Sequence, residues 1–231
     1  MRYALLAAVC GLAAVPATSA HAQQAEEGRF RIGVTGGTLG IGPELGFRFS
    51  ENVGVRGNLT FLSISRDIES DDINYDANLR LASGGAMLDL FPFGGGFRLS
   101  GGLRVNGNRV RGTAQPNAGS NFEIDDVVYT AQQIGTLTAR TKINRVAPSL
   151  TLGYGGGLSR GVFFGIEAGA LFQGSVRIQP LTITGVCAGA TPPAGCGTLT
   201  QDLEAERQSI NEDISGYKVY PILQLSLGYR F

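Results

Sequence analysis

Hydrophobic and polar residues alternate with a period of two along much of the chain. This alternation is the signature of a β-strand whose two faces meet different environments. Phe47 and Arg48 show it near the N-terminus, and Ile166 and Glu167 show it later in the chain. In the C-terminal segment the apolar positions are Val219, Pro221, Leu223, Leu225, Leu227, Tyr229 and Phe231. The pattern predicts an all-β protein.

The alternating segments are about as long as a membrane-spanning strand, ~9–11 residues. We expect strands near 29–36, 38–50, 53–65, 76–91, 97–110, 143–157, 162–177 and 217–231. Tight turns at 50–52, 93–96 and 159–161 alternate with connections at Gly36-Gly37, 66–75, 111–142 and 178–216. A soluble β-sandwich also alternates, but short turns on one side and mostly long loops on the other favour a closed, antiparallel, up-and-down transmembrane β-barrel with long extracellular loops.

At two glycine pairs the local backbone structure has to be chosen between a regular strand, a turn and a bulge. Gly36 and Gly37 form either a hairpin turn or a bulge within one longer strand, and we choose the hairpin because closure requires an even number of strands. In the fourth strand the apolar parity changes between Leu81 and Leu88. A β-bulge at Gly84 and Gly85 would account for this change and would keep Asp89 inside the barrel.

Charged residues occupy the face opposite the apolar one, so we expect them inside the barrel. The predicted interior cluster is Glu44, Arg48, Arg56, Asp89, Arg98, Arg104, Glu167 and Arg230. The interior of an eight-stranded barrel is just wide enough for side chains to fill. The cluster therefore predicts either a plug of salt bridges and hydrogen bonds or a narrow path for ions.

The first 22 residues resemble a secretory signal peptide. Arg2 supplies the positive charge, Ala4 to Val15 the apolar stretch, and Ala20-His21-Ala22 the cleavage site, so the mature domain is expected to span residues 23–231. Cys10 lies in the signal, whereas Cys187 and Cys196 enter an oxidising compartment and are predicted to form a disulfide. Because His21 is the single histidine, the mature chain lacks an imidazole for catalysis or metal binding.

The long loops contain further patterns. Residues 69–76 are acidic, which predicts a solvated loop or, with less support because the regular spacing is missing, a calcium site. Residues 122–129 are rich in apolar and aromatic residues, which indicates ordered strands above the membrane. The pattern from Thr200 to Ser215 predicts a helix with Thr200 as the N-cap. The helix would either pack over the barrel mouth or form a contact surface.

The terminal sequence ending at Leu227, Tyr229 and Phe231 resembles the assembly signal of bacterial outer-membrane barrels. The mature chain is also similar to a group of proteobacterial outer-membrane proteins within the broad OmpA/OmpX/OmpW-like set of small barrels. The segments that carry this likeness are 37–40, 91–95, 135–138 and 217–221. The resemblance implies a location in the bacterial outer membrane and recognition by the barrel-assembly machinery.

Composition limits the possible functions. Lys plus Arg and Asp plus Glu both number 19, so no excess of positive charge is available for nucleic acid. No nucleophile with an orienting base is evident, and we expect neither an enzyme nor a cofactor.

We expect a structural or surface-binding barrel whose loops contact lipopolysaccharide or an unidentified extracellular ligand. The alternative is a porin-like channel for ions or small solutes, and a histidine-free lipid-modifying enzyme is the third possibility.

Overall fold

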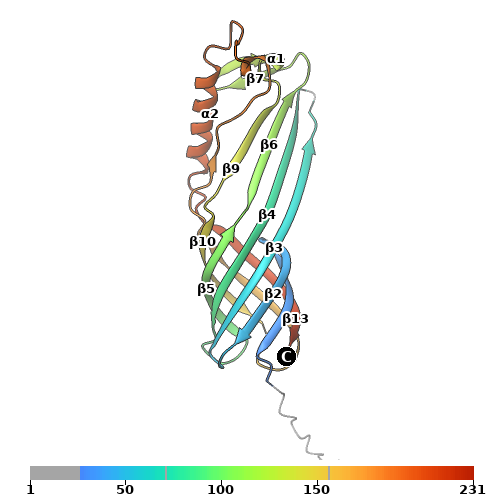
Figure 1. Cartoon of the computed structure of the whole chain (residues 1–231), viewed down its shortest axis with the longest axis vertical. Coiled ribbons are helices and arrows are strands. Elements are labelled where there is room, and N and C mark those ends of the chain that lie inside the picture. Colours follow the sequence, from blue (N-terminus) through green and yellow to red (C-terminus); the bar gives the residue numbers. More distant parts are fainter. Residues whose placement is uncertain (1–26, 71, 156) are drawn as a thin grey trace, which may run out of the picture.

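The computed structural model describes residues 27–70, 72–155 and 157–231. The predicted signal peptide, including Cys10 and His21, lies outside the described residues. The C-terminus lies at the end of the barrel that carries the short turns (Figure 1). Because short turns face the periplasm in barrels of this type, the opposite end is extracellular.

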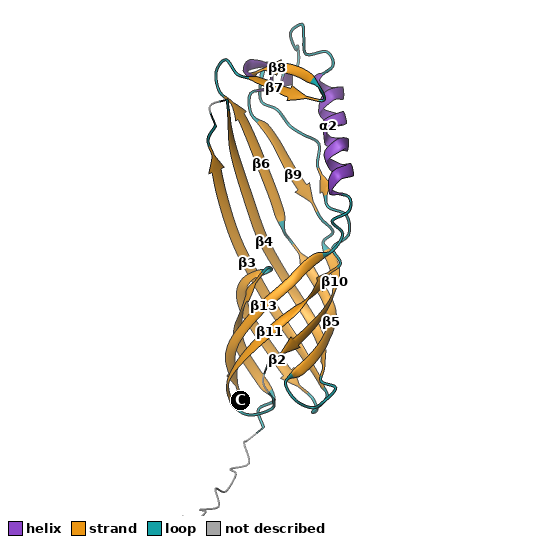
Figure 2. Ribbon diagram, turned by 180° about the vertical axis from the view of Figure 1, so that it is seen from behind, coloured by secondary structure: helices purple, strands orange, loops and turns teal. Residues whose placement is uncertain are grey.

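Eight antiparallel strands close into a barrel, as predicted (Figure 2). Their ring order is β1, β2, β3, β4, β5, β10, β11 and β13, and β13 pairs back onto β1. Closure leaves no free sheet edge, so the backbone hydrogen bonds are satisfied within the wall. The bounds are β1 Phe30–Gly37, β2 Gly40–Arg48, β3 Val53–Ile68, β4 Ile73–Leu90, β5 Phe97–Asn106, β10 Val146–Tyr154, β11 Gly161–Leu171 and β13 Tyr220–Arg230.

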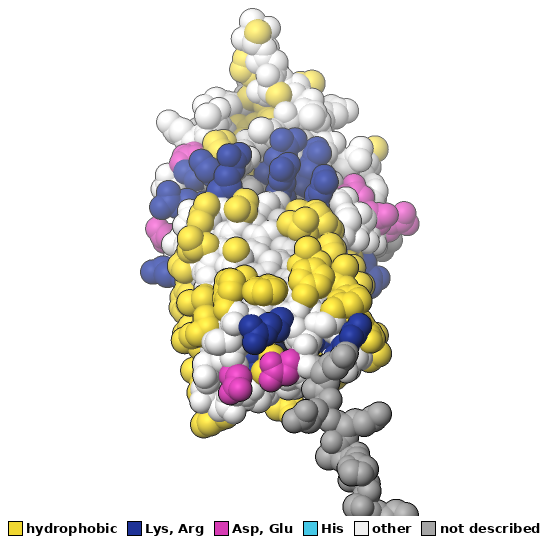
Figure 3. Space-filling model, turned by 60° about the horizontal axis from the view of Figure 1, so that its bottom comes forward, with side chains coloured by type: hydrophobic (Ala, Val, Ile, Leu, Met, Phe, Trp, Pro, Cys, Tyr) yellow, Lys and Arg dark blue, Asp and Glu magenta, His cyan; other side chains and the backbone are white. Residues whose placement is uncertain are grey.

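The outward side chains of these strands form a hydrophobic belt (Figure 3). Leu225 and Leu150 are 48% and 59% exposed, whereas their inward neighbours Gln224 and Thr151 are 4% and 2% exposed. A soluble protein rarely exposes so large an apolar surface, so the belt contacts lipid. Closed antiparallel barrels with such a belt are outer-membrane proteins, and the fold therefore places the chain in a bacterial outer membrane.

A folded extension rises from one side of the barrel (Figure 1). Strands β3 and β4 continue beyond the ring, and β6 Arg109–Pro116, β9 Leu137–Lys142 and β12 Arg177–Ile178 extend their sheet. A cap lies at its tip and along its side, formed by β7 Asn121–Ile124, β8 Val127–Thr130, α1 Ala131–Ile134, the 3-10 turn Val186–Ala188 and α2 Leu199–Ile214. The regions predicted as long loops at 111–142 and 178–216 are therefore largely ordered structure.

The cap has a small core of its own. Ile124, Tyr129, Ile134 and Leu199 are buried together. The Tyr129 hydroxyl donates a hydrogen bond to the Asp202 carboxylate, and burial together with this bond raises the pKa of Tyr129. The predicted Cys187–Cys196 disulfide is present, with 5.5 Å between the Cα atoms, and Cys187 packs against the cap core.

The glycine pairs behave differently from each other. Gly37 pairs with Gly40, so β1 and β2 form the predicted hairpin, but its turn is Thr38 and Leu39 rather than Gly36 and Gly37. The predicted bulge at Gly84 and Gly85 is wrong, because both residues keep an unbroken register with β3 and β5. Leu81 points inward and is buried. The apolar parity along β4 changes because the surroundings of its two faces change, while the register of the strand does not.

Two other predicted elements need correction. The strand predicted at 97–110 is two strands, because β5 ends at Asn106 in the barrel and β6 begins at Arg109 in the extension. The predicted helix is α2, but it begins at Leu199, and the N-cap is Thr198, whose side chain makes no capping hydrogen bond. In the described part of the chain, neither helix has the length and apolar composition needed to cross a membrane.

Replacing both Cys187 and Cys196 with serine should loosen the cap and leave the barrel intact. Removing a short disulfide loop should lower the local free energy of unfolding by about 2–4 kcal/mol. Hydrogen exchange of the amides at 186–199 should therefore accelerate, while amides of β11 and β13 keep their protection. Reduced wild-type protein is the matched control and should behave like the variant; unchanged exchange at 186–199 would contradict the prediction.

Candidate functional site

The centre of the barrel interior is the Arg56 guanidinium, which contacts three carboxylates. Its Nη1 lies 3.3 Å from Oε2 of Glu44, and its Nε lies 3.2 Å from Oδ2 of Asp89. Nη1 also forms an ion pair with Glu167. These side chains come from β2, β3, β4 and β11, so the contacts join opposite walls of the ring.

Two further arginines complete the network. Nη2 of Arg31 lies 3.2 Å from Oε1 of Glu44 and 3.6 Å from Oδ2 of Asp89. Nη2 of Arg98 lies 2.8 Å from Oε2 of Glu167. The network thus pairs three arginines with three carboxylates, and its formal charges cancel. All six residues are at most 7% exposed.

Arg31 was not in the predicted cluster. The signal that would have identified it is present, because Arg31 alternates with the lipid-facing Phe30 and Ile32. The first strand is short and rich in glycine, so its parity was not assigned from the sequence.

Glycines on the inward face make room for the large arginine side chains. A Cβ atom at Gly46 would lie 2.6 Å from Nε of Arg31, and one at Gly85 would lie 2.7 Å from Nη1 of Arg104. At either position an added Cβ would force the arginine side chain to move. The inward face therefore pairs a charged residue with a glycine on the neighbouring strand.

Three members of the predicted cluster are buried but lie outside the ion network. Arg104 donates to Oδ1 of Asn58 at 2.9 Å and to Oγ of Ser83 at 3.0 Å. Arg230 donates to the Gly155 carbonyl at 3.1 Å. The structure therefore brings together Glu44, Arg56, Asp89, Arg98 and Glu167, and it separates Arg48, Arg104 and Arg230 from them.

Arg48 lies at the periplasmic end of the barrel. Its guanidinium donates to the carbonyls of Gly94 at 2.7 Å and Gly95 at 3.2 Å, in the turn between β4 and β5. It also donates to the Glu51 carbonyl in the turn between β2 and β3, and it stacks 3.7 Å from the centre of the Phe91 ring. Arg48 thus fastens two neighbouring periplasmic turns together at the rim of the barrel.

An apolar layer closes the other end of the ring. Leu39, from the turn between β1 and β2, packs with Ala147, Leu171 and Ile222, and all four are at most 4% exposed. Tyr220 packs against this layer, and its hydroxyl donates to the Thr38 carbonyl at 2.6 Å. The interior therefore has an apolar layer toward the extracellular side, a charged layer in the middle and an arginine at the periplasmic end.

The arrangement offers little for acid–base chemistry. Glu44, Asp89 and Glu167 are each held by at least one guanidinium group, and none faces an open cleft. Within residues 27–70, 72–155 and 157–231, His, Cys, Asp and Glu side chains do not gather in groups of three or more as metal ligands would. In the acidic region near 69–76, a hydrogen bond between Asp67 and Asp76 raises the pKa of Asp67.

The residues of the predicted assembly signal line the outer surface of β13 and its end. Leu227, Tyr229 and Phe231 are 57%, 39% and 51% exposed, and the last two rings pack edge to face with 4.9 Å between their centres. They are available to a partner on the lipid side of the barrel.

Substituting Arg56 with methionine should destabilise the barrel strongly, because three buried carboxylates lose a shared counter-charge. Breaking a buried ion pair from one side costs about 3–5 kcal/mol. The change can be measured as the free energy of unfolding in detergent, using the gel-mobility difference between folded and unfolded barrels. Arg66→Met on the same strand is the control, since its exposed side chain should change stability by less than about 0.5 kcal/mol. Equal stability of the two variants would show that the network is not needed.

Comparison with known proteins identifies a shared fold. A scan of family models and a search of curated proteins gave no match. The solved structures of CarO2 and CarO from Acinetobacter baumannii are both similar to this chain, with TM-scores of 0.57 and 0.54. Each is 18% identical and covers 89% of this chain, and the alignments include 100% and 98% of those chains. The likeness confirms the barrel fold, while membership of the OmpA/OmpX/OmpW-like set stays a prediction.

Proposed function

We propose that this chain is a non-enzymatic outer-membrane barrel with a closed lumen, and that its folded extracellular extension binds a partner outside the cell. The observation that carries the proposal is the closure of the interior by the neutral ion network around Arg56. A barrel of this size has no width to spare once its inward side chains are in place. On this proposal the lumen carries no transport, and the function lies at the extracellular end.

The ends of the lumen support closure. Leu39 and Ile222 exclude water from the outer end because they pack in an apolar layer. At the periplasmic end, Arg48 is 6% exposed and holds two neighbouring turns together at the rim. An ion would have to displace side chains at three successive levels, and each displacement would leave buried groups without partners.

The extension has the properties of a binding platform. It has its own buried core around Tyr129 and Ile134, and the disulfide fixes Cys187 against that core. On helix α2, Arg207 pairs with Glu204, holding the pKa of that carboxyl at about 2, and donates at 3.4 Å to the Ile178 carbonyl of β12. Binding commonly uses loops and caps that a rigid scaffold presents in this way.

Other expected partners follow from the fold. The outward residues Leu227, Tyr229 and Phe231 suit recognition by the barrel-assembly machinery during biogenesis, and the belt requires outer-membrane lipid. The absence of excess positive charge argues against nucleic acid as a partner. The occupied carboxylates of the lumen support a protein without catalytic activity or a cofactor.

A narrow channel is the second candidate function, and one observation favours it. Among the described residues, buried atoms of Thr151, Gln224 and Arg98 in the lumen lack hydrogen-bond partners. Such atoms usually bind ordered water. A file of water past these groups would form a path beside the ion network.

Recordings of the purified protein in planar bilayers should show no steady ohmic steps, because the lumen is closed. Arg98→Ala/Glu167→Ala removes the Arg98–Glu167 and Arg56–Glu167 ion pairs without changing the net charge, so it should widen the lumen and produce steps. Arg66→Ala/Glu69→Ala, outside the ring, is the matched control and should remain silent. Steady steps from the wild-type protein would overturn the closed-lumen proposal in favour of the channel.

Deleting 112–140 or 180–212 should abolish partner binding while the barrel still assembles. In each case the two ends of the deleted segment lie close together, so the chain can be rejoined without a large movement. The Val110 amide nitrogen lies 2.9 Å from Oγ1 of Thr141, and the Ile178 amide nitrogen lies 2.7 Å from Oδ1 of Asn211. Intact cells carrying each variant would be tested for adhesion to protein-coated and glycan-coated surfaces. The control is replacement of the periplasmic turn at 93–96 by an unrelated turn. If neither deletion changed adhesion, the extension would not be a binding element.

A further inference from the structure

Six cations form a basic band on one face of the extension, defined here as Arg80, Arg109, Arg111, Arg140, Lys142 and Arg177. The strand registers place them together. Arg80 lies opposite Arg109, Arg111 opposite Arg140, and Lys142 opposite Arg177. Since residues two apart on a strand share a face, Arg109 shares the face of Arg111, and Lys142 shares that of Arg140. All six side chains are exposed.

The basic band lies directly above the hydrophobic belt. On β4 the outward residues from the periplasmic side are Leu90, Leu88, Ala86, Gly84 and Ala82, and the next outward residue is Arg80. On the neighbouring segment, outward Leu103 and Val105 are followed by outward Arg109. A dense group of Lys and Arg side chains borders the belt on its extracellular side (Figure 3). The band is therefore at the level of the outer-leaflet headgroups.

The cations are not neutralised by the protein. Within the part of the chain that the structure describes, no carboxylate forms an ion pair with any of the six. Like charges directly opposite each other on a sheet destabilise it, and the band contains three such pairs. In the lumen, by contrast, three arginines are matched by three carboxylates. An external anion would relieve the repulsion in the band.

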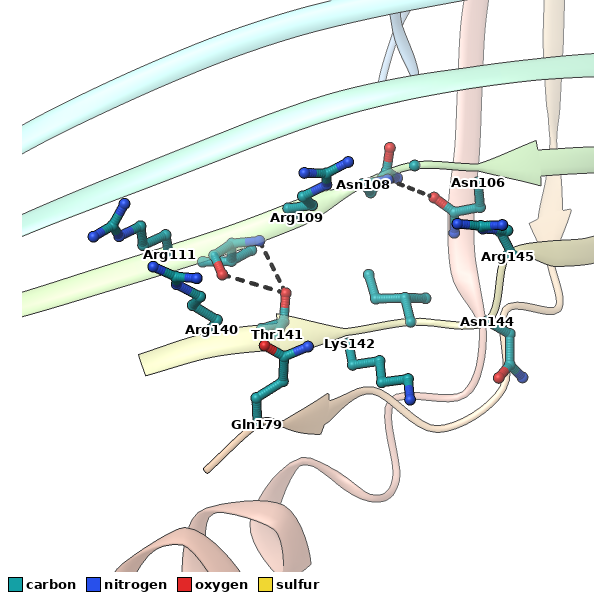
Figure 4. A pocket seen from close by; sticks show the side chains of 13 residues that line it. Asn106, Asn108, Arg109, Arg111, Arg140, Thr141, Lys142, Asn144, Arg145 and Gln179 are labelled. Atoms are coloured by element: carbon teal, nitrogen blue, oxygen red, sulfur yellow. Dashed lines mark hydrogen bonds between the residues drawn. The ribbon is translucent and has the colours of Figure 1, made fainter. Parts of the chain in front are cut away.

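A cavity of about 750 Å³ opens beside the band (Figure 4). It forms where the chain passes from β5 to β6 and from β9 to β10. The Asn106 amide nitrogen donates to the Arg145 carbonyl at 2.6 Å, and the next contact between the two segments is at Val110 and Thr141. Arg109, Arg111, Arg140, Lys142 and Arg145 line the cavity, and no acidic residue does.

Asn106 provides a second, independent indication of a ligand. Its side chain is 4% exposed and lines the cavity, and its Oδ1 accepts a hydrogen bond from the Asn108 amide nitrogen at 3.0 Å. Its Nδ2 is buried and has no hydrogen-bond partner among the described residues. A buried donor without an acceptor is costly, so this amide nitrogen is expected to donate to an atom outside the described residues, either a ligand oxygen or an ordered water in the cavity.

We propose that the basic band and this cavity bind the phosphorylated sugar headgroup of lipid A in the outer leaflet. Arginine donates through a planar fork that matches phosphate oxygens, and five of the six cations in the band are arginines. Basic pockets on the headgroup level of membrane proteins bind anionic lipid headgroups in this way. The site goes beyond the proposed function, since it depends neither on closure of the lumen nor on partner binding by the cap.

The test uses the purified mature protein in a non-ionic detergent with bisphosphorylated lipid A as the probe. Arg111→Gln/Arg140→Gln removes one directly opposed pair of the band. Arg66→Gln/Lys218→Gln, which removes two exposed cations of the extracellular side outside the band, is the matched control. Affinity is measured by native mass spectrometry, and the melting temperature is measured with and without the lipid.

The wild-type protein should bind bisphosphorylated lipid A, and the Arg111→Gln/Arg140→Gln variant should bind it at least about tenfold more weakly. Without lipid, this variant should melt at the same temperature as the wild type or higher, because like-charge repulsion is relieved. The control variant should keep wild-type affinity. Asn106→Leu should also weaken binding, since it removes the unpartnered donor.

Four outcomes would overturn the proposal. The first is equal affinity for bisphosphorylated and fully dephosphorylated lipid A. The second is an equal loss of affinity in the control variant, which would indicate a diffuse charge effect. The third is inorganic phosphate displacing lipid A at equal concentration, which would identify a site for a free anion. The fourth is a lowered melting temperature of Arg111→Gln/Arg140→Gln without lipid, which would show that these cations stabilise the protein by themselves.

Discussion

Charge neutrality inside a narrow barrel is the constraint on which the rest of the structure depends. The eight-stranded ring leaves room only for its own side chains, and every ion placed there is removed from bulk water. Arg56 meets this constraint by contacting carboxylates from three other strands, and Arg31 and Arg98 balance the remaining charge. The same packing favours glycine at positions such as Gly46, where an added Cβ would displace the Arg31 side chain.

This interior determines how the two ends differ. At the periplasmic end the turns are short, and Arg48 ties two of them together. At the other end β3 and β4 extend beyond the membrane. Their inward and outward positions keep alternating in the same order, because the register is unbroken from Val53 to Ile68. One outward face therefore carries Leu88 at the level of lipid tails and Arg80 just above them. The extension thus continues the barrel wall. Its orientation is fixed by the position of the barrel in the membrane.

The eight strands and most inward residues could be predicted because a membrane barrel gives each strand two chemically different faces. The prediction was wrong where that contrast ends. Leu81 is apolar and faces inward, so its parity suggested a bulge at Gly84 and Gly85 that does not exist. The break between β5 and β6 and the pairing of Arg111 with Arg140 depend on contacts between distant segments. Such contacts have no local signal, since period two defines faces but not partners.

The contrast between lumen and basic band indicates what stabilises each. Inside, charges are balanced within the protein, so the barrel needs no ligand to satisfy them. Outside, Arg80 faces Arg109 and Lys142 faces Arg177 at a height where the protein meets headgroups. Carboxylates at half of these positions would neutralise the band within the protein, as Glu44, Asp89 and Glu167 neutralise the arginines of the lumen. On the proposal made above, lipid A phosphates supply the missing negative charge, and the functional unit is the barrel together with its surrounding lipid.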